Sequence, residues 1–121
     1  MKKQALHIVS PMEGSIGEIT KDLLPYFRDI FDVTIEGETE PVDYKMLLCH
    51  FINLSVVNHE NFKKFEKKIL IQPIDGTSIK KEVVESLNKF DLIITPGEAG
   101  KRIMINQGVK SPIVVIQNFY K

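Results

Sequence analysis

The sequence predicts an α/β fold: a single Rossmann-like domain with an open, mostly parallel sheet of about six strands and helices on both faces. Two observations lead to this prediction. Short apolar runs rich in β-branched residues alternate with segments of helical periodicity, a pattern typical of strands buried on both faces. The last third of the chain, residues 88–121, holds strand, helix and strand in close succession. Such a βαβ unit makes its two strands parallel.

The C-terminal βαβ unit has clear boundaries. Phe90–Thr95 is a short apolar strand that stops at Pro96-Gly97, and Pro112–Gln117 is a second strand of the same kind. Between them, Glu98–Gln107 has the composition of a helix. We expect Gly108 to end that helix in the left-handed conformation.

The N-terminal segment predicts a strand followed by a long helix. The strand is Ala5–Ser10, and the helix runs from Ile16 to about Ile30. Ser15, with Glu18 three residues later, has the spacing of a capping box. Pro25 should bend the helix, because it removes one backbone donor. The apolar positions that share one helical face are Ile16, Ile19, Leu23, Phe27 and Ile30.

Three more strands are predicted in the middle of the chain, at Asp32–Glu36, Tyr44–Phe51 and Ile69–Pro73. A helix is expected over Asn58–Lys68, and another is indicated by the spacing of the apolar residues Ile79, Val83, Val84 and Leu87. Right-handed crossovers suggest the strand order 2-1-3-4-5-6. The connection after the second strand is short for a crossover.

Composition fits one globular domain of 121 residues, with 43% hydrophobic and 26% charged residues. The 16 basic and 16 acidic residues cancel, which argues against nucleic-acid binding driven by net charge. The single cysteine, Cys49, excludes an internal disulfide and fits a reducing compartment. No apolar run has the length of a membrane span, and no signal-peptide pattern follows Met1. We therefore expect a cytoplasmic protein.

Four motifs in the last third of the chain carry a family resemblance. They are Asp91–Pro96, Lys101-Arg102, Gly108-Val109 and the strand Ile113–Gln117 with Asn118 after it. In this order they resemble the end of the N-terminal, acceptor-side domain of GT-B retaining glycosyltransferases, the family-four-like group. The resemblance covers most of the chain and is specific in the last third. In that family the asparagine opens the linker to a donor-binding domain, which we expect to be absent from this chain.

The resemblance implies a sugar transfer that needs two domains. The chain would bind the acceptor, and a nucleotide-sugar donor would be held mainly by the donor-binding domain. We therefore expect no cofactor and no activity from the isolated chain. Relatives act on polar or lipid-linked acceptors, which implies peripheral contact with a membrane. The residues Lys63, Lys64, Lys67 and Lys68 would then face anionic lipid, or else form a solvated helix face. A homo-oligomer is compatible with the sequence.

Candidate ligand-binding residues follow the predicted strands, and the carboxyl ends of parallel strands meet at one edge of the sheet. They are Gly14, Ser15, His50, Gly97 and Lys101. Gly14 and Gly97 let a ligand approach the backbone, and the helix N-termini beside them attract anions. His50 can hydrogen-bond a sugar hydroxyl or a phosphate. Lys101 either meets a phosphate or faces water.

The catalytic residue is not identified by the sequence. The family has a His-Asp-like pair after the fourth strand, and here that stretch is Gln72–Gly76, which keeps Asp75 but lacks the histidine. Asp75 is therefore a weak catalytic candidate. Cys49 is expected to pack in the core, and the acidic connection 37–43 to be a loop rather than a metal site. The alternative functions are a non-catalytic binding module of the same fold and a flavodoxin-like nucleotide-binding domain.

Overall fold

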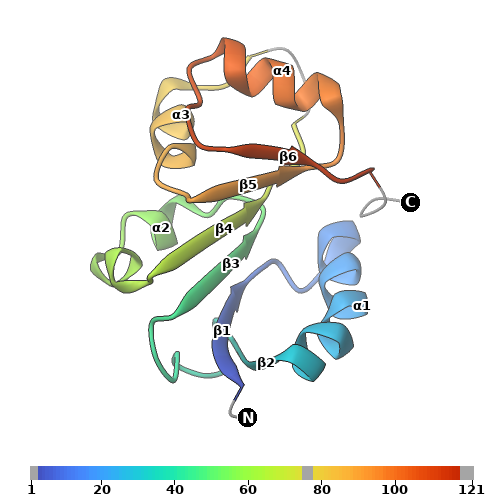
Figure 1. The fold of residues 1–121 in the computed structure, drawn as a ribbon, viewed down its shortest axis with the longest axis vertical. Helices are drawn as coiled ribbons and strands as arrows, with labels where there is room; N and C mark the ends of the chain where they lie inside the picture. Colours follow the sequence, from blue (N-terminus) through green and yellow to red (C-terminus); the bar gives the residue numbers. More distant parts are fainter. Residues whose placement is uncertain (1–2, 75–77, 118–121) are drawn as a thin grey trace.

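In the computed structural model, which describes residues 3–74 and 78–117, the strands form one parallel six-stranded sheet (Figure 1). The strands are β1 Gln4–Val9, β2 Phe31–Ile35, β3 Met46–His50, β4 Lys67–Ile71, β5 Leu92–Thr95 and β6 Ile113–Val115. Their order across the sheet is β2-β1-β3-β4-β5-β6, and every neighbouring pair is parallel. The predicted fold class and strand order are confirmed.

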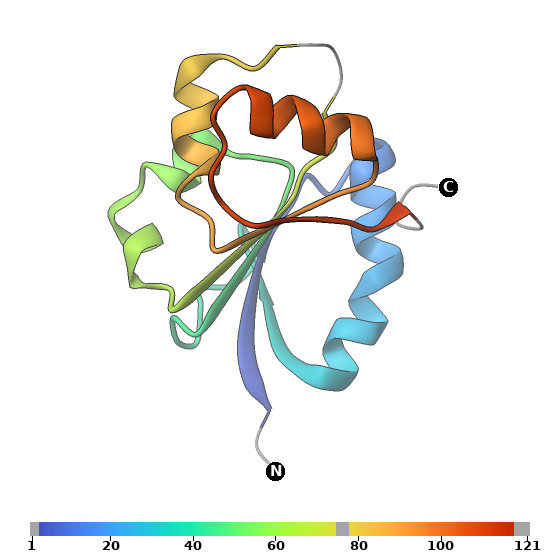
Figure 2. The same ribbon diagram turned by 45° about the horizontal axis from the view of Figure 1, so that its top comes forward.

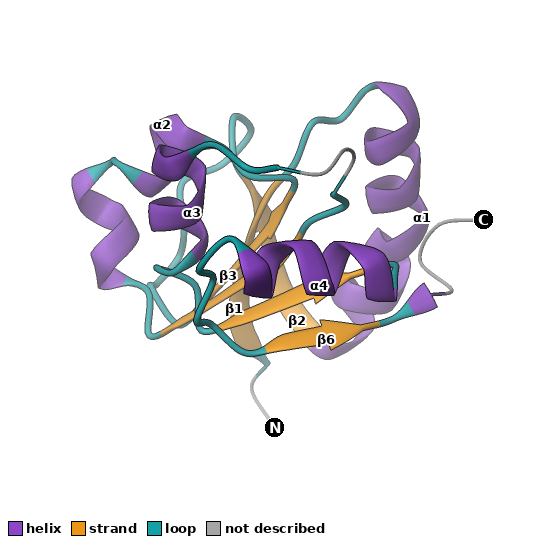
Figure 3. Cartoon of the chain, turned by 90° about the horizontal axis from the view of Figure 1, so that it is seen from above, coloured by secondary structure: helices purple, strands orange, loops and turns teal. Residues whose placement is uncertain are grey.

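The helices cover both faces of this sheet (Figure 2, Figure 3). They are α1 Gly14–Ile30, α2 Leu54–Val57, the 3₁₀ helix η1 Glu60–Lys64, α3 Lys81–Leu87 and α4 Glu98–Asn106. Leu24 of α1 packs in one buried cluster with alternate residues of the strands, among them Ile8 and Leu48. The other helices pack on the opposite face.

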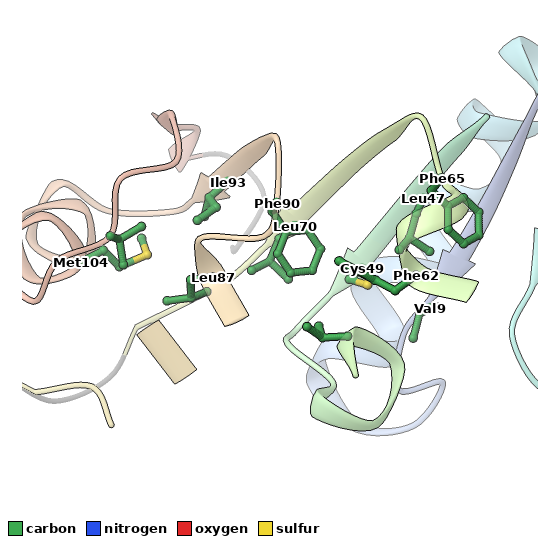
Figure 4. Close-up of a cluster of buried hydrophobic side chains, with 12 residues drawn as sticks. Val9, Leu47, Cys49, Phe62, Phe65, Leu70, Leu87, Phe90, Ile93 and Met104 are labelled. Atoms are coloured by element: carbon green, nitrogen blue, oxygen red, sulfur yellow. The ribbon is translucent and has the colours of Figure 1, made fainter. Parts of the chain in front are cut away.

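The core of that opposite face is shown in Figure 4. Val57 of α2, Phe62 of η1, Leu87 of α3 and Met104 of α4 meet strand residues that alternate with those facing α1. The strand residues are Val9, Leu47, Cys49, Leu70 and Ile93. Cys49 is fully buried there, as predicted.

The edge strand β6 is less well covered on the α1 face. Ile113 packs against the same buried cluster as Leu87 and Met104, so the side chain of the next residue, Val114, points to the opposite side of the sheet. Val114 is 43% exposed and Ile116, just after the strand, is 38% exposed. The sheet is therefore packed on two sides over β3 and β4 and open on one side at β6.

The prediction of one helix over Asn58–Lys68 is wrong. The chain forms α2, then η1, and then enters β4 at Lys67. Phe62 and Phe65 are both buried at a spacing of three, which suits the three residues per turn of a 3₁₀ helix. Lys67 and Lys68 pair with β3, so the four lysines do not share one helix face.

The predicted capping box of α1 is also wrong. Ser15 lies inside the helix, Glu13 is the capping residue, and no side chain makes a capping hydrogen bond. Gly14 begins the helix at φ +75°, a conformation that favours glycine. The helix buries Gly17, Thr20 and Leu24, and Ile30 is 63% exposed at its end.

Two other backbone features concern the ends of the predicted elements. Gly108 follows α4 at φ +101°, as predicted from its position. The connection from β2 to β3 crosses over β1 within residues 36–45 and contains no helix. A crossover of this length leaves part of the sheet face without the usual helical cover.

Candidate functional site

The carboxyl edge of the sheet gathers the beginnings of the two longest helices. Figure 1 shows the start of α1, after β1, and the start of α4, after β5, at the end to which the strand arrows point. Gly97 caps α4 without a side-chain hydrogen bond, and α1 likewise lacks one. The first N–H groups of both helices are therefore not capped by side chains.

A cavity of about 440 Å³ opens at this edge, between the segments that follow β1, β2 and β3. Its lining residues are Val9, Ser10, Pro11, Glu36, Phe51, Ile52, Asn53 and Leu54. β1 and β3 are neighbours, and the chain leaves β1 toward β2 but leaves β3 toward β4, in opposite directions along the sheet. Open α/β sheets bind ligands at such a switch point.

Phe51 gives this cavity an aromatic wall. It follows β3 with φ +72°, the one non-glycine residue with positive φ among residues 3–74 and 78–117. Its N–H donates to the carbonyl oxygen of Ile71 at 2.8 Å, and the next N–H, of Ile52, donates to Oε1 of Gln72 at 2.7 Å. These bonds hold a backbone conformation that costs an L-residue about 1–2 kcal/mol. Strain of this kind is concentrated at functional sites.

A chain of hydrogen bonds leads from the cavity into the protein. Ser10 Oγ lies 2.7 Å from Thr20 Oγ1, which in turn lies 2.7 Å from His50 Nδ1. Ser10 also donates to the carbonyl oxygen of Pro11 at 2.8 Å. The four groups are satisfied together when His50 donates to Thr20 and Thr20 donates to Ser10. The arrangement ties the first strand-to-helix turn, α1 and β3 to one another.

His50 itself is enclosed. Its side chain is 1% exposed, and burial lowers the pKa of its imidazole below the usual 6.5. At neutral pH the ring is therefore uncharged, which suits a hydrogen-bonded positioning group. The sequence placed His50 at the carboxyl end of β3, and the structure puts it there, beneath α1 rather than on the wall of the cavity.

The remaining predicted site residues lie at different places along the edge. Gly14 and Ser15 are exposed at the start of α1, and Gly97 and Lys101 are partly exposed at the start of α4. Neither pair is among the residues lining the cavity beside Phe51. Asp75 lies outside the described residues.

Three polar residues of this site were not found from the sequence: Ser10, Thr20 and Glu36. Ser10 and Glu36 each directly follow a strand, so their positions were a usable signal. Thr20 gave no such signal, because its hydrogen-bond partners, Ser10 and His50, are distant from it in the sequence. A second feature is Thr95, which is fully buried at the end of β5 and whose Oγ1 has no hydrogen-bond partner among the residues that the structure describes.

Glu36 also contacts a buried histidine. Its Oε1 lies 2.7 Å from His7 Nε2, while His7 Nδ1 lies 2.7 Å from Thr34 Oγ1. Within residues 3–74 and 78–117, no group of three or more His, Cys, Asp and Glu side chains is placed to hold a metal ion.

Comparison with family models, with curated proteins and with solved structures gave no match for this chain. In the part of the chain that the structure describes, no helix has both the length and the apolar character needed to cross a membrane.

Proposed function

We propose that this chain is the acceptor-binding domain of a glycosyltransferase, and that the cavity beside Phe51 receives a sugar unit of the acceptor. The observation that carries the proposal is the ring of Phe51. It is 40% exposed, lines the cavity, and is held there by a strained backbone. An exposed aromatic ring with a few polar groups beside it is suited to the C–H face of a pyranose.

The polar groups around the Phe51 ring can bind the hydroxyl groups of a sugar. The Ser10 hydroxyl and the Glu36 carboxylate line the same cavity and can hydrogen-bond sugar hydroxyls. Asn53 Oδ1 accepts the N–H of Val56 at the start of α2, which leaves its amide N–H groups for a ligand. One apolar surface with a few fixed polar groups is the usual composition of a small-molecule site.

Transfer requires a donor-binding domain in addition to this one. The first strand-to-helix turn, Pro11–Gly17, has neither the dinucleotide-binding glycine pattern nor a Walker sequence that would hold a nucleotide diphosphate. The sequence resemblance supplies the complementary argument, because in that family the nucleotide-sugar is held mainly by the second domain. We place the protein in the cytoplasm, with peripheral membrane contact where the acceptor is lipid-linked.

The position of Gln72 supports a second candidate, a non-catalytic binding module of the same fold. Gln72 stands at the end of β4, where the family carries its His-Asp-like pair. It is 5% exposed, and its amide accepts from Ile52 and donates to the carbonyl oxygen of Pro73 at 3.0 Å. The side chain is thus used to fix the backbone after Phe51. This favours binding without chemistry.

The test is chemical-shift mapping of the chain with glucose 6-phosphate and with maltose as probes. We expect shifts at Ser10, Phe51 and Asn53, and loss of most of the affinity in Phe51→Ala. Tyr26→Ala is the matched control, since Tyr26 is an exposed aromatic residue of α1 that does not line the cavity. Equal affinities of the two variants would contradict the sugar site.

Turnover separates the two candidates. UDP-glucose and GDP-mannose serve as donors, with the chain alone and with a donor-binding domain added. The glycosyltransferase proposal expects no turnover by the chain alone and measurable turnover with the second domain. Sugar binding without turnover in any combination would favour the binding module.

A further inference from the structure

A second cavity, of about 350 Å³, lies on the opposite face of β1 from α1. Its floor includes His7 of β1, one wall comes from the helix-free crossover 36–45, and the other comes from α2 and η1. The cavity exists because no crossover helix covers the sheet between β2 and β3. It shares Glu36 and Val9 with the cavity beside Phe51 and is otherwise lined by different residues.

The mouth of this second cavity is acidic. Glu36 and Glu40 both line it, and both are exposed. Glu36 uses one oxygen for His7, and Glu40 has no hydrogen bond or ion pair with any residue in the ranges 3–74 and 78–117. The nearby Lys45 is paired with Glu66, at 3.1 Å between Nζ and Oε2. The carboxylates at the mouth are therefore not neutralised by that lysine.

The negative charge of Glu36 also affects the pKa of a thiol in the core. The pKa of the Cys49 thiol is raised to about 12, first by burial and second by the negative charge of Glu36. The same negative charge favours a cation beside the Glu36 carboxylate.

The wall of the second cavity is aromatic. The ring of Phe65 lies edge-on to Tyr44, at 4.9 Å between centroids, and stacks on the ring of His7 at 6.1 Å. Phe62 is also part of the lining. Lys64 Nζ already lies over the face of the Tyr44 ring, 5.4 Å from its centroid. Aromatic rings beside carboxylates attract cations in this way, because the ring faces carry negative electrostatic potential.

We propose that this second cavity binds a small organic ammonium ion, with the charge at Glu36 and Glu40 and the apolar body against Tyr44 and Phe65. Two carboxylates in the lining favour a positively charged ligand, and the aromatic wall disfavours small hydrated metal ions. The two cavities share Glu36 and Val9, but the aromatic wall and Glu40 belong to this cavity alone, so the site does not depend on the proposed sugar transfer.

Benzylamine is the probe, titrated into the isotope-labelled chain, with benzyl alcohol and phenylacetate as the neutral and anionic counterparts. We expect benzylamine to shift Tyr44, Phe65 and His7 and to bind more tightly than benzyl alcohol, and phenylacetate to bind least. Binding should weaken as sodium chloride is added. Equal binding of the amine and the alcohol would show that charge is not recognised and would overturn the proposal.

Two substitutions sharpen the test. Glu40→Gln, at an exposed position that leaves the fold intact, should weaken benzylamine about two- to fivefold, in line with a solvent-exposed charge pair. Glu38→Gln is the matched control, since Glu38 is exposed in the same loop and does not line the cavity. Glu36→Gln should weaken the amine as well. Unchanged affinity in Glu40→Gln and Glu36→Gln, or shifts confined to Phe51 and its neighbours, would refute the site.

Discussion

Phe51 offers a test in which backbone strain and ligand contact can be separated. We expect Phe51→Gly to be more stable than Phe51→Ala by about 0.5–1 kcal/mol. Both variants lose the packing of the buried part of the ring, roughly 100 Å² or about 2.5 kcal/mol. Alanine keeps the cost of the left-handed backbone, about 1–2 kcal/mol, and glycine does not. Part of that gain is offset, because glycine has more freedom in the unfolded chain, worth about 0.5–1 kcal/mol.

The assay is urea unfolding of the two variants, with the pair Tyr26→Gly and Tyr26→Ala as the control. Tyr26 lies inside α1, where alanine should be the more stable by about 1 kcal/mol. The order of stability should therefore reverse between positions 51 and 26. If alanine is the more stable residue at both positions, the backbone at Phe51 is not strained and the reasoning fails. Both substitutions at position 51 should weaken binding of glucose 6-phosphate, because both remove the ring.

Three further predictions concern buried polar groups. Thr95→Val should raise the free energy of unfolding by about 1–3 kcal/mol, because it replaces a hydroxyl that has no partner within residues 3–74 and 78–117 with a methyl group; a loss of stability in urea unfolding would mean that this hydroxyl is bonded. Cys49, with its pKa raised to about 12, should react with Ellman's reagent far more slowly in the native chain than in urea, and equal rates would contradict its burial. The free energy of unfolding should fall as the pH drops below about 6.5, because the unfolded chain then binds a proton that the buried ring of His50 resists. His50→Gln should reduce this pH dependence and His59→Gln, at an exposed position, should leave it; equal slopes in both variants would exclude His50 as its source.

The strand order was predictable because each strand is a short apolar run with its own boundaries. Runs such as Tyr44–Phe51 and Phe90–Thr95 have no competing helical pattern, and right-handed crossovers then restrict the topology. Gly108 was also predictable, since a glycine after a helix takes the left-handed conformation at little cost.

Local patterns failed where distant contacts decided the structure. Asn58–Lys68 looks helical by itself, but the backbone of Lys67 and Lys68 pairs with β3, and Lys68 N–H donates to Asp91 Oδ2 at 2.8 Å. Ser15 and Glu18 have capping-box spacing, but the helix begins earlier, at Gly14. The spacing of residues in the sequence reveals neither the pairing with β3 nor the earlier start of α1.

The edge of the sheet at which the cavity lies was predictable, but none of the five predicted ligand-binding residues lines that cavity. The carboxyl edge follows from parallel strands, so the region around His50 was identified correctly as the end of β3. The strained conformation of Phe51 and the chain from Ser10 through Thr20 to His50 depend on residues brought together by folding. The proposed sugar site is argued from the Phe51 conformation and from this hydrogen-bond chain. Neither feature produces a recognisable pattern in the sequence.

The most direct test of the sugar site is the measurement of intermolecular nuclear Overhauser effects between bound glucose 6-phosphate and the chain. The account predicts contacts from the C–H protons of the sugar ring to the ring protons of Phe51, and their loss in Phe51→Ala. Contacts to Tyr44 and Phe65 instead, or to no aromatic ring at a saturating concentration, would contradict it.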